Sequence, residues 1–542
     1  MKTKHLVTCC CKYLFSACLV FTLNFSKSYG QAELLPISQE LDNKLGWQRY
    51  FSELHKNHTA LRSNFISDFS DTTDKDSLFL GFLPEIQPWQ TKNWFFRKIF
   101  TEHLVEVKKS DYSFYLDFLP DFQIGKQGDH TLWLNTRGLE IGGKVGRQFA
   151  FTSHFFENQG TFADYYTDYA RANRIVPGQG RARAYGTRGF DYGYSGGTIS
   201  YTPSKYINFQ LGYDKNFIGD GYRSLLLSDN AFNYPFFKVT ATLGKLRYMA
   251  MYAQFIDFYD HFDLEQFDED NPYPKKYGIF HYLSWNATNR LSLGLFENVM
   301  WEPRGFDFSY VSPLVFARPV EFANGSPDKV LMGLNASYKI ADRYVAYGQF
   351  MLNEFRGKDF FSGEGHWATK HGEQLGIKGF DLFHLAGLSA QAEMNTVRPY
   401  SYASLEHFTN YGHYNQPLAH PYGANFREFL GIVNYRYKRF SLRLQLTGAM
   451  YGLDVDGLNY GKDIYKSYAT RVSETGIFTG NGLKTHLHYT DARISYLLNP
   501  KNNLRIELGY IRRTEENEQM YNKQQVLNIG LRSSFRNLYS DF

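Results

Sequence analysis

Residues 211–239 have the sequence LGYDKNFIGDGYRSLLLSDNAFNYPFFKV, and this stretch contains the pattern that decides the fold. It begins with the alternation of apolar and polar residues that is typical of a β-strand. The alternation stops at Gly-Asp-Gly (219–221), and after the Leu triplet at 225–227 a second strand begins near Tyr234. Two strands joined by a long segment with charged and apolar residues predict a structured loop at the mouth of a β-barrel.

The same period of two continues from about Tyr112 to the end of the chain. It is clearest in LRLQLT at 442–447, LRIELGY at 504–510 and LNIGLR at 527–532. Successive side chains of a strand point to opposite faces, so one face of each segment meets lipid and the other meets water. About eighteen such segments can be marked, which lies within the range of bacterial outer-membrane barrels.

Short and long connections take turns along this region. Short turns are expected near residues 203–205, 243–244, 287–289, 341–342, 437–438 and 499–501, and long connections at about 158–193, 216–233, 257–275, 300–328, 356–371, 397–426 and 453–485. Outer-membrane barrels have tight periplasmic turns and long extracellular loops. The sequence therefore predicts an all-β fold, a transmembrane outer-membrane β-barrel of about 18 antiparallel strands over residues 111–542.

The N-terminus is typical of a secretory signal peptide over residues 1–30. Lys2 and Lys4 precede an apolar run at 6–25, and small residues follow at 28–30. A lipoprotein signal at Cys18 is the alternative, although the apolar run continues beyond it. Residues 31–110 are expected to form a partly helical periplasmic region, because apolar residues between Trp47 and Phe65 have helical spacing.

Composition excludes several classes of function. All four cysteines lie at or before residue 18, so the exported chain has no thiol for disulfides, zinc binding or catalysis. The formal net charge of +5, from 59 basic and 54 acidic residues, gives no reason to expect a nucleic-acid partner. Aromatic residues make up 18% of the chain, which suits the aromatic girdles of a membrane barrel. No cofactor is expected.

Several motifs resemble one family, the Wzi-type capsule-assembly outer-membrane proteins. The stretch 211–239 is similar to that family's GYDK…GxG…LLLSDNA…P segment at Asp214, Lys215, Gly219, Gly221, Ser228, Asp229, Asn230 and Pro235. SPLVFARPVE at 312–321, VRPYSY at 397–402, HYNQPLAHPYGANF at 413–426 and the final YSDF look like the Bacteroidetes branch, which includes gliding-motility-associated, RemB-like barrels. The resemblance implies an eighteen-stranded barrel that holds surface polysaccharide in a lectin-like manner or serves the gliding machinery.

The chain ends in NLYSDF, which places an aromatic residue after the last expected strand. This end resembles the signal that the barrel-assembly machinery recognises in outer-membrane proteins. The expected location is therefore the outer membrane, with the long loops extracellular.

The loop at 158–193 is the first candidate binding site. Its basic and aromatic candidates are Arg171, Arg174, Arg181, Arg183, Tyr185 and Arg188. Guanidinium groups bind carboxylates and phosphates through paired hydrogen bonds, and aromatic faces can stack on sugar rings. An acidic surface polysaccharide suits this chemistry. The alternative is that these residues bind lipopolysaccharide phosphates or pair with the loop's own aspartates, and charge clusters are more commonly of that kind.

Further charged residues leave two alternatives open. Asp214, Lys215, Asp220, Arg223 and Asp229 either line a glycan or cation site or form an internal salt-bridge network. Arg318 and Arg398 are additional polysaccharide-binding candidates, the second accompanied by His413 and His420. The spacing of these carboxylates and histidines matches no known metal-binding motif, so no metal is predicted.

The leading hypothesis is a non-enzymatic outer-membrane barrel that binds or anchors surface polysaccharide. GYSGG at 193–197 lacks the strand-turn-helix context of a nucleophile elbow, so no enzyme activity is expected. The alternatives are an accessory role in gliding motility through protein partners, and a diffusion channel through a lumen that about eighteen strands can enclose.

Overall fold

The computed structural model describes residues 32–51, 58–62, 64–68, 75–83, 86–257, 273–301, 305, 307–310, 319–320, 328–354 and 357–542. The predicted signal peptide lies outside these residues.

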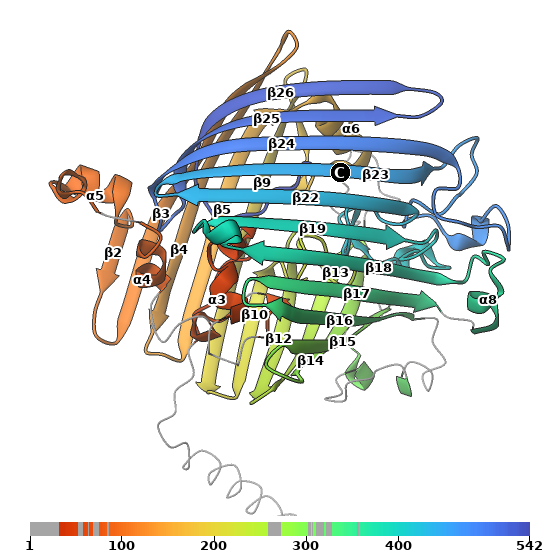
Figure 1. The fold of residues 1–542 in the computed structure, drawn as a ribbon, viewed down its shortest axis with the longest axis horizontal. Coiled ribbons are helices and arrows are strands. Elements are labelled where there is room, and N and C mark those ends of the chain that lie inside the picture. The colour runs from red at the N-terminus through yellow and green to blue at the C-terminus, as the bar shows by residue number, and fades with distance from the viewer. Residues whose placement is uncertain are drawn as a thin grey trace, which may run out of the picture.

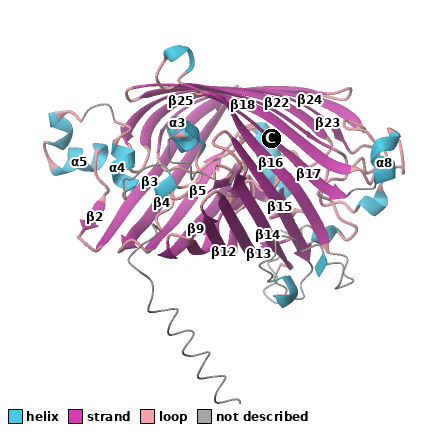
Figure 2. Cartoon of the chain, turned by 60° about the horizontal axis from the view of Figure 1, so that its bottom comes forward, coloured by secondary structure: helices cyan, strands magenta, loops and turns pink. Residues whose placement is uncertain are grey.

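Eighteen antiparallel strands form one closed barrel, as the sequence pattern predicts (Figures 1 and 2). They are β3 (Tyr112–Gln127), β4 (His130–Val145), β5 (Phe149–Thr161), β9 (Gly189–Ser204), β10 (Ile207–Asp214), β12 (Tyr234–Leu243), β13 (Leu246–Ile256), β14 (Lys275–Asn286), β15 (Leu291–Trp301), β16 (Lys329–Ala341), β17 (Tyr344–Glu354), β18 (Lys370–Phe380), β19 (Leu388–Val397), β22 (Phe426–Tyr437), β23 (Phe440–Leu453), β24 (Leu483–Asn499), β25 (Leu504–Glu516) and β26 (Tyr521–Arg532). The ring closes where β26 pairs with β3, from Leu527 opposite Lys126 to Leu531 opposite Phe122. Closure leaves no open sheet edge in the wall, as a lipid environment requires.

The outer face of the barrel is apolar and the inner face is polar. Leu211, Leu375 and Phe429 are 60%, 63% and 60% exposed on the outside. The residue before each of them, Gln210, Gln374 and Glu428, points inward and is at most 2% exposed. A soluble β-sandwich has the reverse arrangement, with its apolar face inside. Lipid outside the barrel and polar contacts inside it favour the arrangement seen here.

The connections sort by length as predicted. One end, here called the short-turn end, has connections of two to seven residues at 146–148, 205–206, 244–245, 287–290, 342–343, 381–387, 438–439 and 500–503. The other end, here called the long-loop end, has connections at 162–188, 215–233, 257–274, 302–328, 355–369, 398–425 and 454–482. Two connections at the long-loop end are short, 128–129 and 517–520, and they flank the seam between β26 and β3.

The helices are short and most lie near the short-turn end. They are α2 (Gln39–Lys44), α3 (Gly46–Phe51), α4 (Lys75–Leu80), α5 (Trp94–Phe100), α6 (Asp164–Asn173) and α8 (Gly357–Ser362), with 3-10 turns η1 (Ile66–Asp68), η2 (Pro88–Thr91), η3 (Phe308–Tyr310), η4 (Leu382–His384), η5 (His407–Thr409) and η6 (Tyr468–Thr470). Among the described residues, no helix is long and apolar enough to span a membrane. The helical spacing between Trp47 and Phe65 corresponds only to α3, since residues 52–57 lie outside the described part.

The N-terminal segment enters the barrel at the short-turn end. Its short strand β1 (Leu61–Arg62) pairs with β11 (Phe217–Ile218), which belongs to the connection between β10 and β12. The hydroxyl of Tyr50 on α3 donates to Asp220 at 2.9 Å. Figure 2 shows α3 within the outline of the wall, with α4 and α5 to one side. The strand β2 (Val105–Lys108) then leads into β3, with which it pairs.

The connection at 215–233, which we call the inner loop, fills the interior instead of standing at the mouth. Every residue from 216 to 234 is buried. The Leu triplet at 225–227 packs in a core with Met251, Tyr402 and Leu418. Gly333 on β16 makes room for it, because a Cβ there would lie 2.2 Å from Leu226 Cδ2. The prediction of a structured loop is confirmed, but its position at the barrel mouth is wrong, because the apolar triplet is shielded from water only inside the barrel.

The last ten residues, which we call the tail (533–542), also lie inside the barrel. Ser533 Oγ donates to the carbonyl of Pro120, and Phe542 packs against Tyr169 of α6, which covers the long-loop end. Figure 1 shows the C-terminal mark within the outline of the wall. The last strand ends at Arg532, so Phe542 does not follow it directly, because the last ten residues run inside the barrel.

Three further pairs of short strands stabilise the loops: β6 (Ile175–Val176) with β7 (Gly180–Arg181), β8 (Arg183–Tyr185) with β9, and β20 (Gly412–His413) with β21 (Gln416–Pro417).

Candidate functional site

The long-loop end carries the loop at 162–188 that the sequence singles out. Its helix α6 buries Tyr165, Tyr166 and Ala170, and Arg174 ends it in the left-handed conformation with a φ of 61°. The buried tyrosines pack against Phe542 of the tail. Because one face of α6 is buried, its remaining charged residues are held at the outer surface.

The basic residues of this loop differ in their partners. Arg188 forms an ion pair with Asp164, and the guanidinium of Arg181 lies 5.8 Å from the ring of Tyr273. Arg171 donates only to the carbonyl of Thr187, at 3.3 Å. Among the described residues Arg171, Arg174 and Arg183 have no carboxylate partner, and Arg171 and Arg183 are exposed. These guanidinium groups remain available to an external anion.

Tyr185 and Arg183 lie on the outside of the barrel rim. Tyr185 packs edge-on against Trp133, with 6.2 Å between the ring centroids. Trp133 is opposite Ile124, which is 58% exposed on the outer face of β3. Arg183 and Tyr185 are two residues apart on β8 and share this face. An aromatic pair with a neighbouring cation on the outer rim suits contact with lipopolysaccharide as well as with a free polysaccharide.

Asp220, Arg223 and Asp229 form the internal network that was one of the two alternatives. Arg223 Nη2 lies 2.9 Å from Glu428 Oε1 on β22 and 2.8 Å from Asp541 Oδ2 of the tail. Burial opposes its charge, but Asp541 and Glu428 hold the pKa of Arg223 well above its ordinary value. The ion cluster therefore joins the inner loop, the wall and the tail.

The two aspartates of the network also bond to other parts of the chain. Asp220 accepts hydrogen bonds from Tyr50 at 2.9 Å and from Asn335 at 3.2 Å. Asp229 accepts from Tyr539 and Asn537, both at 2.8 Å. Asp220 and Asp229 are at most 2% exposed. Their carboxylates therefore face protein partners inside the barrel.

Asp214 and Lys215 lie at the start of the inner loop. Asp214 Oδ1 accepts from the amide of Lys215 at 2.8 Å, and Lys215 Nζ donates to the carbonyl of Asp229 at 2.9 Å. Burial lowers the pKa of Lys215 to about 8, against the opposing effect of Asp229 and Asp214. Both residues fix the loop's conformation in the structure.

Arg398 bridges loops at the long-loop end, donating to the carbonyl of Ile477 at 2.7 Å and to that of His366 at 3.4 Å. Its companions His413 and His420 are buried, and His420 Nε2 lies 2.7 Å from Glu428 Oε2. Arg318 lies outside the described residues. Ser195 belongs to the continuous strand β9, as the absence of an elbow context suggests.

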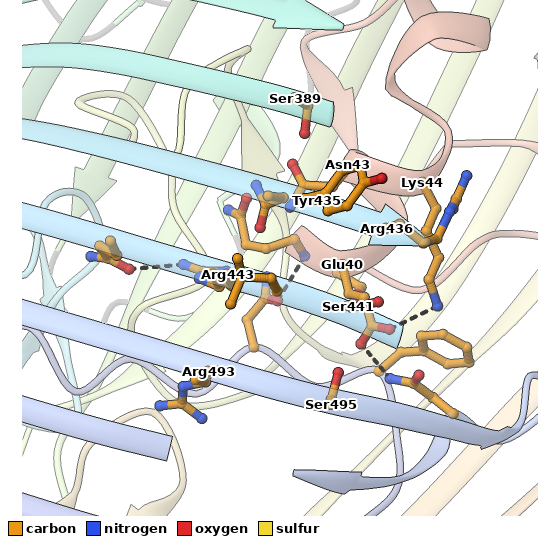
Figure 3. A pocket seen from close by; sticks show the side chains of 18 of the residues that line it. Glu40, Asn43, Lys44, Ser389, Tyr435, Arg436, Ser441, Arg443, Arg493 and Ser495 are labelled. Carbon is orange, nitrogen blue, oxygen red and sulfur yellow. Dashed lines mark hydrogen bonds and ion pairs between the residues drawn. The ribbon is translucent and has the colours of Figure 1, made fainter. Parts of the chain in front are cut away.

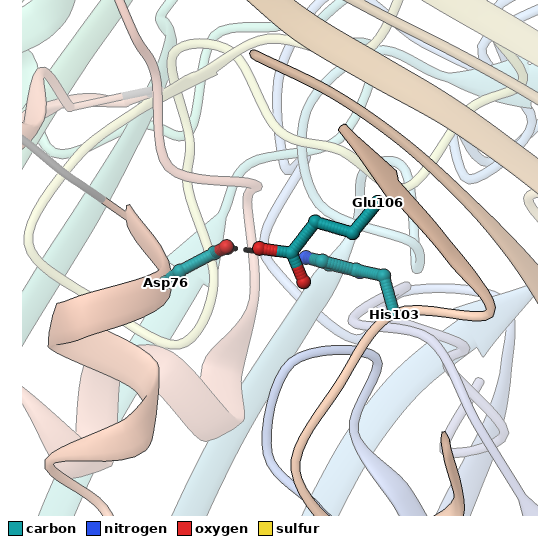
Figure 4. A group of neighbouring side chains, drawn as sticks. All are labelled: Asp76, His103 and Glu106. Atoms are coloured by element: carbon teal, nitrogen blue, oxygen red, sulfur yellow. Dashed lines mark hydrogen bonds and ion pairs between the residues drawn. The ribbon is translucent and has the colours of Figure 1, made fainter. Parts of the chain in front are cut away.

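Sequence reasoning missed an ionic cluster at the short-turn end (Figure 4). Ligand atoms of Asp76, His103 and Glu106 lie within 4.8 Å of one another. Lys501 supplies the positive charge, with Nζ 3.1 Å from Asp76 and 2.8 Å from Glu106. The cluster is thus an ion-pair network that fastens α4 and β2 to the turn at 500–503, and we assign no metal to it.

The His103 imidazole makes this fastening dependent on pH. Burial disfavours its charge, but hydrogen bonds to Asp117 at 2.5 Å and Asp76 at 3.1 Å raise its pKa above 6.5. A group whose pKa is higher in the folded than in the unfolded state contributes its full stabilisation of the fold below the unfolded-state pKa. This contribution is lost as the pH rises through the folded-state pKa. The stabilising contribution of His103 should therefore be smaller at pH 9 than at pH 6, and urea unfolding measures it.

The matched variant is His103→Gln, which keeps a side chain that can hydrogen-bond but removes the titratable group. The stability that this variant loses relative to the wild type, measured by urea unfolding, should be larger at pH 6 than at pH 9. Identical pH profiles for the two proteins would contradict this account of His103.

Comparison with known proteins agrees with the class of protein that the wall defines, an outer-membrane β-barrel. The sequence matches no family model and no curated protein. Among solved structures, it is similar to Wzi of Escherichia coli, described as an outer-membrane protein involved in group 1 capsule assembly and a carbohydrate-binding β-barrel. The TM-score is 0.53 at 12% identity, over 93% of this chain and 100% of that chain. The fold is therefore Wzi-like, and an identity this low carries the fold alone.

OprD of Pseudomonas aeruginosa and OccAB2 of Acinetobacter baumannii are more distant. Their TM-scores are 0.41 and 0.42, at 11% and 10% identity. Each comparison covers 77% of this chain, with 94% of OprD and 97% of OccAB2. No argument about this protein rests on them.

Proposed function

We propose that this protein is a non-enzymatic barrel of the outer membrane that binds or anchors surface polysaccharide through its long-loop end. In this proposal the signal peptide directs export and the long loops face the exterior. The observation that carries it is the pair of exposed guanidinium groups, Arg171 and Arg183, which have no carboxylate partner among the described residues. Arginine on a surface of this kind is suited to the carboxylates or phosphates of an acidic polymer. The Wzi-like fold supports the same proposal.

The filled interior favours surface binding over diffusion. The inner loop and the tail occupy the region that a channel would need, and the Leu triplet at 225–227 is packed in an apolar core. The gliding alternative, with its Bacteroidetes branch and its protein partners, rests on the sequence resemblance, and no contact in the described residues favours it. The role of the barrel-assembly machinery likewise remains a proposal.

The test is calorimetric titration of the refolded protein with purified, acidic surface polysaccharide from its host. Replacing both Arg171 and Arg183 by alanine should weaken binding roughly five- to tenfold, since exposed ionic contacts contribute up to about 1 kcal/mol each. Higher salt should weaken wild-type binding as well, because it screens exposed charges. Arg290→Ala, which removes an exposed arginine at the short-turn end, is the matched control. Equal affinities for the double variant and the control would contradict the proposed binding face.

A further inference from the structure

A chamber of about 290 Å³ lies inside the barrel at the short-turn end, away from the long loops (Figure 3). Its walls are the helices α2 and α3, the inner faces of strands β22 to β26, and residues 534–541 of the tail. Trp47 on α3 lines it and is 42% exposed, which places the chamber next to solvent. The volume is close to the lower end of typical small-molecule sites, roughly 300 Å³.

The chamber has an excess of positive charge. Seven lysine and arginine residues line it against five carboxylates, so the lining has a net charge of +2. The carboxylate of Glu507 is shared by three arginines, with Arg493 at 2.9 Å, Arg505 at 3.0 Å and Arg532 close by. The carboxylate of Asp541 is engaged by Arg223. Glu40 pairs with Lys44 and Asp491 with Arg493, so four of the five carboxylates already have an ionic partner.

Arg436 and Arg443 are the cations that remain. Arg443 donates to the amide oxygen of Gln445 at 2.8 Å, and Arg436 Nη1 is buried without a hydrogen-bond partner. Among the described residues neither forms a direct ion pair, although the carboxylates of Asp381 and Glu40 interact electrostatically with Arg436. Arg443 is also directly opposite Arg493 in the strand register. Arg493 is itself paired with Asp491 and Glu507, so Arg443 is the cation of this pair that an added anion could bind.

Unpaired hydroxyl groups lie in the same two rows of the inner wall. Ser441 is opposite Arg436 on one side and Ser495 on the other, while Ser389 is opposite Asn434, the partner of Arg443. Within the described part of the chain, the hydroxyls of Ser389, Ser441 and Ser495 have no hydrogen-bond partner. Ser441 and Ser495 are only partly buried, and hydroxyls that both donate and accept hydrogen bonds suit a ligand rich in hydroxyls.

An aromatic ring completes the arrangement. Trp47 presents its indole at the rim, and such a face can stack on the apolar side of a sugar ring. Guanidinium groups for a carboxylate, hydroxyls for ring oxygens and an indole at the entrance together match an acidic saccharide.

We propose that this chamber binds an acidic saccharide, whose carboxylate bonds to Arg443 or to Arg436 and whose hydroxyls bond to Ser389, Ser441 and Ser495. The site goes beyond the proposed long-loop face, because it uses different residues at the opposite end of the barrel. Binding in the chamber and binding at the long-loop end can therefore be lost independently of each other.

The test uses the full chain in detergent micelles and an oligomer of glucuronic acid as the probe. Calorimetry should show saturable binding that is at least roughly tenfold tighter than binding of a neutral glucose oligomer of the same length. The double variant Arg436→Gln with Arg443→Gln should lose roughly tenfold or more in affinity, as expected for removal of charged hydrogen bonds. Arg290→Ala should bind the oligomer like the wild type. The loop pair Arg171→Ala with Arg183→Ala is titrated beside it to show whether the oligomer uses the long-loop face instead of the chamber.

Four outcomes would overturn the proposal. Absence of saturable binding would do so, and so would equal affinity for the neutral oligomer or for inorganic phosphate. A loss seen only in the loop pair would place the oligomer on the long-loop face, which would leave the proposed function standing. If the arginine variant does not fold, Ser441→Ala with Ser495→Ala serves in its place and should also weaken binding of the uronate oligomer.

Discussion

Replacing Arg223 by alanine is expected to destabilise the folded barrel by about 3–5 kcal/mol. The guanidinium is 2% exposed and lies within 2.9 Å of both Glu428 and Asp541, which are 0% and 2% exposed. Its removal leaves two carboxylates close together in the interior without their cation. The cost of an uncompensated buried charge exceeds the modest net contribution of the intact ion pair, because the charges are already desolvated.

Urea unfolding of the refolded protein in detergent micelles measures this effect. Arg183→Ala is the matched control, and as an exposed arginine without a carboxylate partner it should change stability by no more than about 0.5 kcal/mol. Combining Arg223→Met with Glu428→Gln and Asp541→Asn should recover much of the loss, since no unpaired charge remains. A loss below about 1 kcal/mol in Arg223→Ala would contradict the role assigned to the cluster.

Removing residues 534–542 is expected to turn a closed barrel into a conducting one. An eighteen-stranded wall is wide enough to enclose an aqueous channel, so the segments inside must block it. The tail contacts α2 through Asn537, the inner loop through Tyr539 and α6 through Phe542. Its removal breaks all three contacts and takes Asp541 away from Arg223.

Recordings in planar bilayers give the readout for this deletion. The full chain should show no steady open-channel current, and the shortened chain should conduct at least roughly tenfold more. Phe542→Ala keeps the rest of the tail in place and should remain closed. Equal currents from the full and the shortened chain would contradict a blocking role for the tail, and steady conductance in the full chain would favour the diffusion-channel alternative.

The wall of the barrel could be predicted from the sequence because each strand carries its own signal. Leu442, Leu444 and Leu446 alternate with polar residues, and the structure places these leucines outside. The lengths of the connections alone were enough to predict which connections lie at the same end of the barrel. No information about long-range contacts was needed. The two short connections at 128–129 and 517–520 broke the pattern only beside the seam.

The interior could not be predicted in the same way, because its partners are far apart in the sequence. Arg223 meets Glu428 and Asp541 across 205 and 318 positions, and alternation contains no information about such pairs. The Leu triplet at 225–227 was a signal for burial inside the barrel, since three consecutive leucines do not suit a loop in water. The chamber arginines Arg436 and Arg443 were visible only as polar positions of strands that alternate.

The long separation between Arg223 and Asp541 has a consequence for the order of folding. This contact closes a loop of 318 positions, and the chain loses the entropy of that loop before it gains the energy of the contact. The contact therefore forms slowly compared with hairpins between neighbouring strands. The hairpins of the wall can form early from local contacts, whereas the inner loop and the tail reach their final packing late. The seam between β26 and β3 joins residues that are still farther apart in the sequence. The interior and the seam are therefore both expected to form after the hairpins.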